Sequence, residues 1–262
     1  MPELPDVELV ARHLRRRIRG RRVSRVDVRD RSVVRSPAPR VFAHRLRGRT
    51  VLTVGRRGKY LLFFLSGGFA MVGHLRMTGD FVVVPRRSLV RPHTRLVIGF
   101  GSSELRFVDQ RRFGHVDLVS AAGLEAFPGL RKLGVEPLTP SFSPDRLRDL
   151  IGRRRGALKA FLLRQDLIAG IGNLYADEIL FQARLHPARA LGTLRPRQLR
   201  GLYRSIRAVL RRGIAALSRR GGAEGDFIAV REKGGRCPRC GGPIRTAAIG
   251  GRTTYFCPRC QR

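Results

Sequence analysis

All four cysteines of the 262-residue chain occur in two Cys-Pro-Arg-Cys pairs, and sixteen residues separate the pairs. Each CxxC pair can form a tight turn that directs two thiolates at one metal ion, and this spacing is typical of a structural zinc site. The alternative, two redox-active dithiols, lacks the thioredoxin-type βαβ pattern that usually surrounds them. Four thiolates leave no position for a substrate. We therefore expect one structural zinc ion, held by Cys237, Cys240, Cys257 and Cys260.

The segment between the two pairs, IRTAAIGGRTTYF, is typical of a β-hairpin with its turn at Gly250-Gly251. Arg252 follows this turn directly. An arginine on a hairpin that is fixed by zinc is well placed to bind a phosphate group, although an isolated arginine is more often a solvated surface charge. The hairpin is thus a candidate anion-binding element.

Two kinds of secondary structure must position these groups. Apolar residues at helical spacing predict a helix over residues 6–18, with Asp6 as its cap. Eight short β-rich runs between about Val23 and Val119 predict an antiparallel sandwich or barrel. Four helical patterns follow, near residues 144–153, 156–164, 173–184 and 195–217. A glycine-rich hinge, AGIGN, precedes the third of them and makes Asn173 its expected cap.

The proline-rich, aperiodic stretch LGVEPLTPSFSP marks a domain boundary. We expect an α+β chain with an N-terminal β-sandwich domain, a linker, a helical domain and a zinc-ribbon finger. Their expected ranges are 1–132, 133–143, 144–227 and 228–262.

The charge balance indicates a polyanionic partner. Lys and Arg together number 54 against 19 Asp and Glu, which gives a formal net charge of +35. A folded chain tolerates so much self-repulsion most readily when it binds nucleic acid. Lysine occurs only four times, so that an arginine-rich codon bias contributes to the excess. Charge therefore favours nucleic acid as a class of partner and does not indicate any chemistry.

The N-terminus contains acidic residues before any basic one and does not resemble a secretory signal peptide. The most apolar stretch, residues 60–75, is interrupted by glycine, serine and histidine, and this pattern predicts two paired strands and no membrane span. We expect a cytoplasmic or nucleoid-associated protein that does not bind membranes.

Seven motifs in order along the chain resemble the formamidopyrimidine-DNA glycosylase and endonuclease VIII family. They are MPELPDVE, GRRGKYLL, HLRMTG, DQRRFG, LGVEPL, AGIGNLYADEILF and GRTTYFCPRCQR. Each motif alone is weak evidence, but together they cover the chain from Pro2 to Arg262. The resemblance implies a β-sandwich with a leading helix, a helical domain with a helix–two-turn–helix element, and a zinc ribbon. It also implies a bacterial, monomeric DNA repair enzyme. This enzyme would be a bifunctional DNA glycosylase and abasic-site lyase that acts on double-stranded DNA with damaged bases or abasic sites and cuts the strand by β,δ-elimination.

The resemblance gives the N-terminus a chemical role. Removal of Met1 would expose Pro2 as a secondary amine that is partly unprotonated near neutral pH and therefore nucleophilic. By similarity, Glu3 is the general acid/base and Lys59 contacts phosphate and assists proton transfer. Without the resemblance, a terminus of this kind would be regarded as an ordinary mobile end.

The same resemblance assigns residues to DNA binding. Asn173 and Arg252 are expected at the phosphate beside the flipped nucleotide. Met77, Arg111 and Phe113 match the family's wedge, which fills the space that an extruded base leaves. His74 and Lys159 complete the expected DNA-binding set. Glu178 either supports this site or is a structural carboxylate.

Two departures from the family pattern affect the expected substrate. Asp6 replaces a glutamate that is common in the formamidopyrimidine branch. After the Gly221-Gly222 and Asp226-Phe227 pattern, only residues 228–236 precede the first zinc cysteine. Oxidised-purine specialists have a longer connection here, which closes over everted 8-oxoguanine. We therefore expect 8-oxoguanine to be a weak substrate, unless another loop, near Arg86–Pro92, covers the pocket.

Two other functions compete with the enzyme. A non-catalytic protein that binds damaged or abasic DNA could keep the fold, but the presence of Pro2, Glu3 and Lys59 favours catalysis. A ribosome-associated zinc-ribbon protein would explain the charge and the cysteines but not the N-terminal motif.

Overall fold

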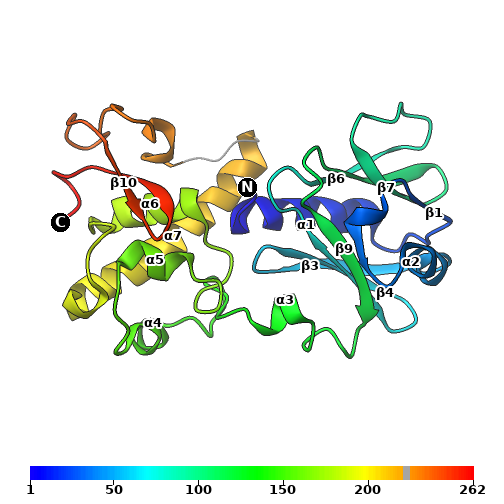
Figure 1. Cartoon of the computed structure of the whole chain (residues 1–262), viewed down its shortest axis with the longest axis horizontal. Coiled ribbons are helices and arrows are strands. Elements are labelled where there is room, and N and C mark those ends of the chain that lie inside the picture. The colour runs from blue at the N-terminus through cyan, green and yellow to red at the C-terminus, as the bar shows by residue number, and fades with distance from the viewer. Residues whose placement is uncertain (221–224) are drawn as a thin grey trace. The chain divides into compact units, whose positions relative to one another are not determined.

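The structure, a computed structural model, describes residues 1–220 and 225–262. The chain divides into two compact units, each described here by itself (Figure 1). The first unit contains Met1–Pro2 and Val7–Arg131, and the second contains Glu3–Asp6 and Lys132–Arg262. No helix in the described ranges is long and apolar enough to cross a membrane.

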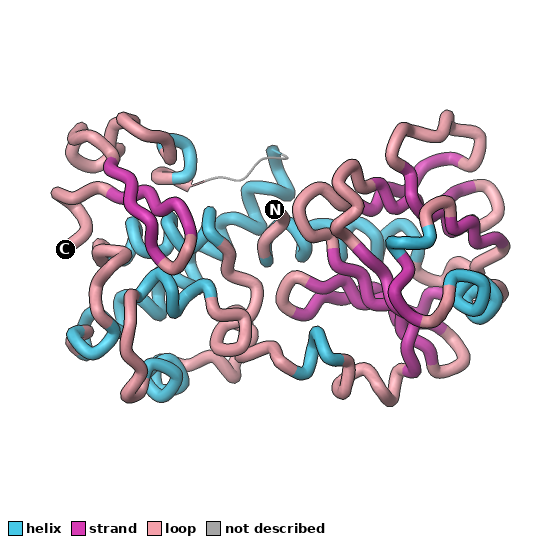
Figure 2. Tube along the Cα trace, viewed as in Figure 1, coloured by secondary structure: helices cyan, strands magenta, loops and turns pink. Residues whose placement is uncertain are grey.

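Two β-sheets form the first unit (Figure 2). The four-stranded sheet is antiparallel and has the order β1-β7-β8-β6, with β1 at Arg25–Val28, β7 at Thr94–Gly99, β8 at Ser103–Val108 and β6 at Asp80–Pro85. The five-stranded sheet has the order β2-β9-β5-β4-β3, with β2 at Val34–Ser36, β9 at His115–Ser120, β5 at Phe69–His74, β4 at Tyr60–Leu65 and β3 at Val51–Arg57. The eight strands expected from the sequence are all present. The structure adds β2, which pairs parallel to β9 and departs from the all-antiparallel expectation.

The core of this unit contains apolar side chains from both sheets and from helix α1 (Leu4–Ile18). Val7, Ala11, Leu14 and Ile18 form the buried stripe of that helix, because residues three and four apart share one helix face. Two further helices, α2 (Pro39–Leu46) and the single turn α3 (Pro128–Arg131), were not expected from the sequence. The predicted sandwich with a leading helix is therefore confirmed.

The second unit is mainly helical. Its helices are α4 (Pro144–Ile151), α5 (Leu158–Leu163), α6 (Asn173–Ala183) and α7 (Pro196–Arg220), close to the four expected ranges. Their apolar faces share one core, and α6 is buried along most of its length. Residues 133–143, expected to be a linker, belong to this unit. Val135 bridges to Ile168, and Leu138 packs against the helical core.

The predicted zinc hairpin is present as β10 (Arg245–Ile249) and β11 (Arg252–Phe256). Its two turn residues, Gly250 and Gly251, have φ angles of +59° and +70°. Two consecutive residues in the left-handed region favour glycine and form the turn that matches the twist of a two-residue hairpin. The turn places Arg252 at the first position of β11, opposite Ile249.

Helix α1 belongs to both units. Leu4 packs in the core of the second unit, whereas Val7 packs in the core of the first. Glu3, which precedes this helix, and Leu4, its first residue, thus belong with helices that are more than a hundred residues away in the sequence.

Candidate active site

Glu3 caps the N-terminus of helix α6. Its carboxylate accepts hydrogen bonds from the backbone N–H groups of Gly172 (2.8 Å), Leu174 (2.8 Å) and Tyr175 (3.2 Å). The first N–H groups of a helix have no partner within the helix, and the helix dipole favours a negative charge at this end. Glu3 is only 3% exposed, and these three donors stabilise its ionised form. Glu3 is therefore a fixed, oriented carboxylate directly after Pro2.

The glycines of the AGIGN motif make room for this contact. A Cβ atom at Gly172 would overlap the side chain of Glu3, and one at Gly170 would lie 2.8 Å from the Cβ of Leu4. The backbone N–H of Leu4 also donates to the carbonyl of Gly170 (3.0 Å). The N-terminal motif and the central motif thus form one structural unit, although 169 positions separate Glu3 from Gly172.

Two capping predictions were wrong by a small shift in the helix starts. Helix α1 begins at Leu4, so that Asp6 lies in its first turn, where its Oδ2 accepts from the backbone N–H of Glu3 (2.8 Å). Helix α6 has Gly172 as its N-cap residue, and Asn173 is its first helical residue. Gly172 has no side chain to cap the helix, so that Glu3 does so from a distant part of the sequence.

Asn173 and Arg252 occupy neighbouring elements of the second unit, α6 and β11. The side-chain amide of Asn173 donates to the carbonyl of Thr253 (3.1 Å), the residue after Arg252. Arg252 itself is exposed. The structure thus brings together two of the residues expected at a phosphate.

Lys159 was expected to bind DNA, but the structure places it in the interior of the second unit. Its side chain is fully buried and forms an ion pair with Asp177 (2.7 Å). It also donates to the hydroxyl of Thr254 (2.8 Å) and to the carbonyl of Thr253 (3.3 Å). A side chain without exposed surface does not present its charge to DNA, so that we interpret Lys159 as a residue that holds the zinc hairpin.

In the first unit, Lys59 and His74 lie at one end of the five-stranded sheet. Lys59 follows the Gly58 turn between β3 and β4 and is 8% exposed. Tyr60 is paired in register with His74, and their rings are 4.6 Å apart in an edge-to-face arrangement. His74 Nδ1 accepts from the backbone N–H of Arg76 (3.0 Å), so that its Nε2 carries the proton.

The neighbouring strand adds two titratable groups that the sequence did not single out. His115 lies opposite His74 in the sheet, with the two rings stacked at 5.7 Å. Burial, together with the positive charge of Arg76, lowers the pKa of His74 to about 3. Burial likewise lowers the pKa of His115 to about 4 and raises that of Asp117 to about 6. Near neutral pH both histidines are therefore uncharged.

The three expected wedge residues lie on loops of the first unit. Met77 is 41% exposed and Phe113 is 50% exposed, which is unusual for large apolar side chains. The guanidinium of Arg111 lies over the ring of Phe113 at 4.7 Å. The fully buried carboxylate of Asp109 orders this loop, because it accepts from the Thr78 hydroxyl and from the N–H groups of Arg111 and Gly114.

The four cysteines converge on one point. Their sulfur atoms all lie within 4.8 Å of one another, with 3.8 Å between Cys237 and Cys260 and 3.6 Å between Cys240 and Cys257. A tetrahedral ion with Zn–S bonds of about 2.3 Å separates its sulfur ligands by about 3.8 Å. The donor set and its spacing fit a single structural Zn²⁺.

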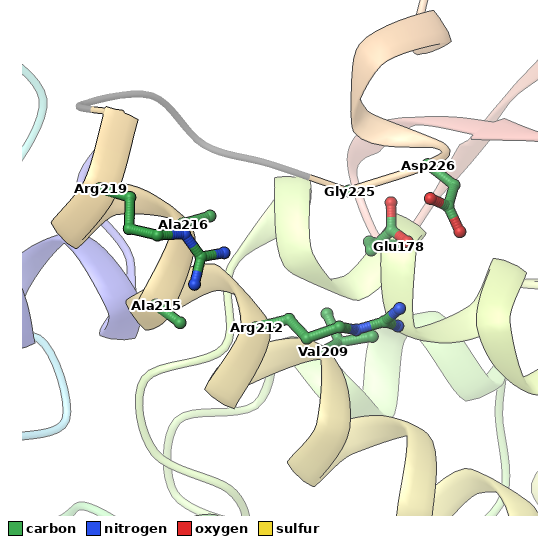
Figure 3. A pocket seen from close by; sticks show the side chains of 8 residues that line it. All are labelled: Glu178, Val209, Arg212, Ala215, Ala216, Arg219, Gly225 and Asp226. Carbon is green, nitrogen blue, oxygen red and sulfur yellow. The ribbon is translucent and has the colours of Figure 1, made fainter.

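Glu178, the residue after Asp177, holds the segment that contains Phe227 and Ile228. Its carboxylate accepts from the N–H groups of Phe227 and Ile228, both at 3.0 Å. A pocket of about 270 Å³ adjoins it (Figure 3). Arg212 and Arg219 extend into this pocket from α7, and Glu178 and Asp226 line its other side. The predicted Gly221-Gly222 pattern lies outside the described residues.

Three family models match almost the whole chain. The N-terminal domain of formamidopyrimidine-DNA glycosylase matches residues 1–116, and its helix–two-turn–helix domain matches residues 133–221. A zinc finger found in this glycosylase and in isoleucyl-tRNA synthetase matches residues 234–262.

The chain belongs to the formamidopyrimidine-DNA glycosylase family. It is 40% identical to the formamidopyrimidine-DNA glycosylase of Pelotomaculum thermopropionicum, over all of this chain and 99% of that one. It is 44% identical to the enzyme of Symbiobacterium thermophilum, over all of this chain and 89% of that one. By this membership it is a DNA glycosylase of DNA repair.

Solved structures of the family agree with the fold. The Lactococcus lactis formamidopyrimidine-DNA glycosylase bound to abasic-site DNA has a TM-score of 0.90 and 31% identity, with 99% of each chain covered. The same enzyme bound to DNA with an N7-benzyl formamidopyrimidine lesion has a TM-score of 0.91 and 31% identity, with both chains fully covered. Both of these structures show the Lactococcus lactis enzyme in complex with DNA that contains an abasic site or a damaged base.

Sequence reasoning missed Asp109, His115 and Asp177. Asp177 left a signal, because Asp177 and Glu178 are two adjacent acids in an otherwise apolar helix and must be paired if buried. Asp109 and His115 left none, because their importance depends on loop and strand partners that only the fold brings together.

Proposed function

We propose that the chain excises damaged bases and cuts the DNA strand with Pro2 as the nucleophile, after removal of Met1. The proline nitrogen attacks C1′ of the damaged nucleotide, the glycosidic bond breaks, and the base leaves with a proton. The C1′–O4′ bond then breaks, O4′ takes up a proton, and an iminium forms between C1′ and the proline nitrogen. The iminium acidifies the C2′ protons, so that β-elimination breaks the C3′–O bond and δ-elimination then breaks the C5′–O bond.

The observation that supports this proposal is the position of the Glu3 carboxylate at the N-terminus of helix α6. A carboxylate held by three N–H donors has a defined position and orientation, as a group that transfers protons beside a nucleophile must. Burial of a charged side chain is costly, and in a mobile terminus Glu3 would remain in solvent, whereas here it is only 3% exposed. Lys59 and the neutral His74 are the groups of the first unit that we assign to phosphate and proton transfer.

Asn173 and Arg252 support a phosphate contact of the second unit. Asn173 is the first residue of α6, where the helix dipole favours an anion, and its side-chain amide donates to the carbonyl of Thr253, the residue after Arg252 on β11. In the first unit, the exposed Met77, Arg111 and Phe113 support a wedge that enters the duplex when a base is extruded.

Borohydride trapping on abasic-site DNA tests the catalytic proposal. The parent protein should form a covalent complex, Pro2→Gly should lose most of it, and Glu3→Gln should lose base excision while it keeps DNA affinity. An N-terminal extension that blocks Pro2 without loss of activity would refute the mechanism. Binding to abasic DNA without trapping would indicate the non-catalytic binder.

We further propose that 8-oxoguanine is a weak substrate, whereas hydantoins, formamidopyrimidines and abasic sites are good ones. Residues 228–236 form a short, anchored path, with a 3₁₀ turn at Ile228–Val230 and Arg231 paired with Asp177 (2.7 Å). The alignment with the Pelotomaculum enzyme extends over 277 positions, so that the relative has residues without a counterpart in this 262-residue chain. A short connection supplies few contacts to an everted base, and lesions that stack poorly need them least.

Single-turnover rates on matched duplexes decide this point. Release of a hydantoin should be faster than release of 8-oxoguanine opposite cytosine. Equal rates would show that the short connection does not limit purine recognition, and would implicate another loop, such as the one near Arg86–Pro92.

A further inference from the structure

A buried charge cluster connects helix α5, helix α6 and the zinc hairpin. Its centre is Asp177, whose Oδ1 lies 2.7 Å from Lys159 Nζ and whose Oδ2 accepts from Arg231 Nε at 2.7 Å. The side chains of Asp177 and Lys159 have no exposed surface. The guanidinium of Arg231 also lies over the ring of Tyr255 on β11, at 4.6 Å. The cluster therefore contacts the hairpin from two sides.

One chain of hydrogen bonds leads from Asp177 to the backbone of Arg252. Asp177 pairs with Lys159, Lys159 donates to the hydroxyl of Thr254 (2.8 Å), and that hydroxyl donates to the carbonyl of Arg252 (3.1 Å). Lys159 and Asn173 both donate to the carbonyl of Thr253. Asp177 lies four residues after Asn173, on the same face of α6.

A buried ion pair is costly to form, and an apolar pair of similar volume is often as stable or more stable. Burial raises the pKa of Asp177 and lowers that of Lys159, which shows that desolvation works against both charges. The benefit of this pair is therefore geometric. An apolar pair would fill the same space, but it would not donate to Thr253 and Thr254 or fix the hairpin's position along α6.

We propose that Asp177 is a positioning residue that, through Lys159, holds Arg252 beside Asn173 so that both bind one DNA phosphate. This inference rests on the proposed DNA contacts of Arg252 and Asn173 but not on the chemistry of Pro2. Asp177 itself touches no DNA. Its loss should therefore abolish what Arg252 contributes to binding.

A double-mutant cycle on DNA affinity tests the proposal, with a duplex that carries an uncleavable tetrahydrofuran abasic-site analogue. Arg252→Ala should weaken binding about tenfold, as expected for the loss of one charged phosphate contact. Asp177→Asn should weaken it by a similar factor, and the double variant should be no weaker than Asp177→Asn alone within about twofold. At saturating enzyme, the single-turnover rate of Asp177→Asn should equal that of Arg252→Ala within about threefold, because Asp177 acts through Arg252.

Asp145→Asn is the matched control, because it removes one acid from the same unit at an exposed surface pair with Arg148. It should bind as the parent does. If Asp177 only stabilises the fold, Asp177→Asn should lower the melting temperature, and Arg252→Ala should weaken DNA binding as much in this variant as in the parent. Such additive losses of affinity would overturn the proposal. So would an Arg252→Ala variant with parental affinity. Loss of borohydride trapping with the coupling intact would refute the catalytic proposal alone.

If Asp177→Asn does not fold, the Lys159→Met/Asp177→Leu variant replaces the pair with apolar side chains of similar volume. It should fold and retain zinc, and Arg252→Ala should have no further effect on its affinity. Parental affinity in this folded variant would overturn the proposal.

Discussion

The carboxylate of Glu3 occupies the space where a side chain at position 172 would begin. Gly172 has a φ of −124° and a ψ of −166°, which alanine also adopts, so that only the lack of space excludes a larger residue. Gly172→Ala should therefore displace Glu3 and reduce base excision at least about 100-fold, the usual result of misplacing a reacting group by an ångström. Single-turnover kinetics measure this effect.

The matched control for that variant is Gly201→Ala in helix α7, where an added Cβ meets nothing within 4 Å. It should keep full activity. Normal base excision by Gly172→Ala would mean that the position of Glu3 at the N-terminus of α6 is dispensable for catalysis.

Metal analysis should find one zinc ion per chain, bound by the four converging cysteines. Chelation should weaken DNA binding because the hairpin that carries Arg252 loses its anchor. The β-sandwich has its own core and should stay folded, which circular dichroism can check. Freshly purified, active protein without zinc would contradict this prediction.

Affinity for undamaged duplex should fall steeply with salt. Each neutralised phosphate contributes about −0.9 to the slope of log K against log salt concentration. Arg252→Ala should make the slope shallower by about one unit. A salt-independent affinity would mean that the basic surface, with a net charge of +35, faces a partner other than DNA.

Acid should destabilise the first unit through His115. Its pKa is lowered from 6.5 to about 4, so that the folded state binds fewer protons than the unfolded state between these values. The stability that His115 contributes is present above pH 6.5 and is lost as the pH falls toward 4. Between pH 6.5 and pH 4, the free energy of unfolding of His115→Gln should therefore fall by about 2 kcal/mol less than that of the parent protein.

Urea unfolding at pH 7.5 and pH 4.5 measures that difference, and His44→Gln, at an exposed histidine, is the control. Asp117 acts in the opposite direction, because its pKa is raised to about 6 and its neutral form is favoured in the folded state. Asp117→Asn should accordingly be stabilising above pH 6. Equal acid sensitivity of the parent and His115→Gln would contradict the assignment.

Phe113→Ala should slow the excision of a base from duplex DNA more than it slows cleavage of a preformed abasic site. The wedge offsets the cost of extruding a stacked base, which amounts to a few kcal/mol, and an abasic site has no base to extrude. Leu52→Ala removes an apolar side chain of similar exposure on β3 and is the control. Equal effects on both substrates would argue against a wedge.

The sequence predicted the local elements well because their signals are local. The helical stripe of Val7, Ala11 and Leu14, the glycine turn of the hairpin and the CxxC pairs each depend on residues close in sequence. The resemblance to a known family supplied the order of the domains and the site residues. It placed Lys159 on DNA, because a motif position does not reveal whether a side chain is exposed or buried.

The remaining features depend on contacts between distant segments. The cap on α6 comes from Glu3, so that no pattern near Asn173 could reveal it. The pairing of β2 with β9 is parallel and short, and β2 has only three residues with little periodicity. Buried polar groups such as Asp109 and Asp177 become informative only when their partners are known.

The division of helix α1 between the two units bears on how the protein is made. Residues 3–6 leave the ribosome first but find their partners only after the AGIGN motif has been synthesised. Until then, Leu4 lacks its place in the helical core and Glu3 lacks its three donors. Nascent chains that end before this motif cannot assemble the carboxylate that we assign to proton transfer. A fragment that starts at Lys132 lacks Glu3, so that the proposed strand cleavage requires a chain that contains both segments.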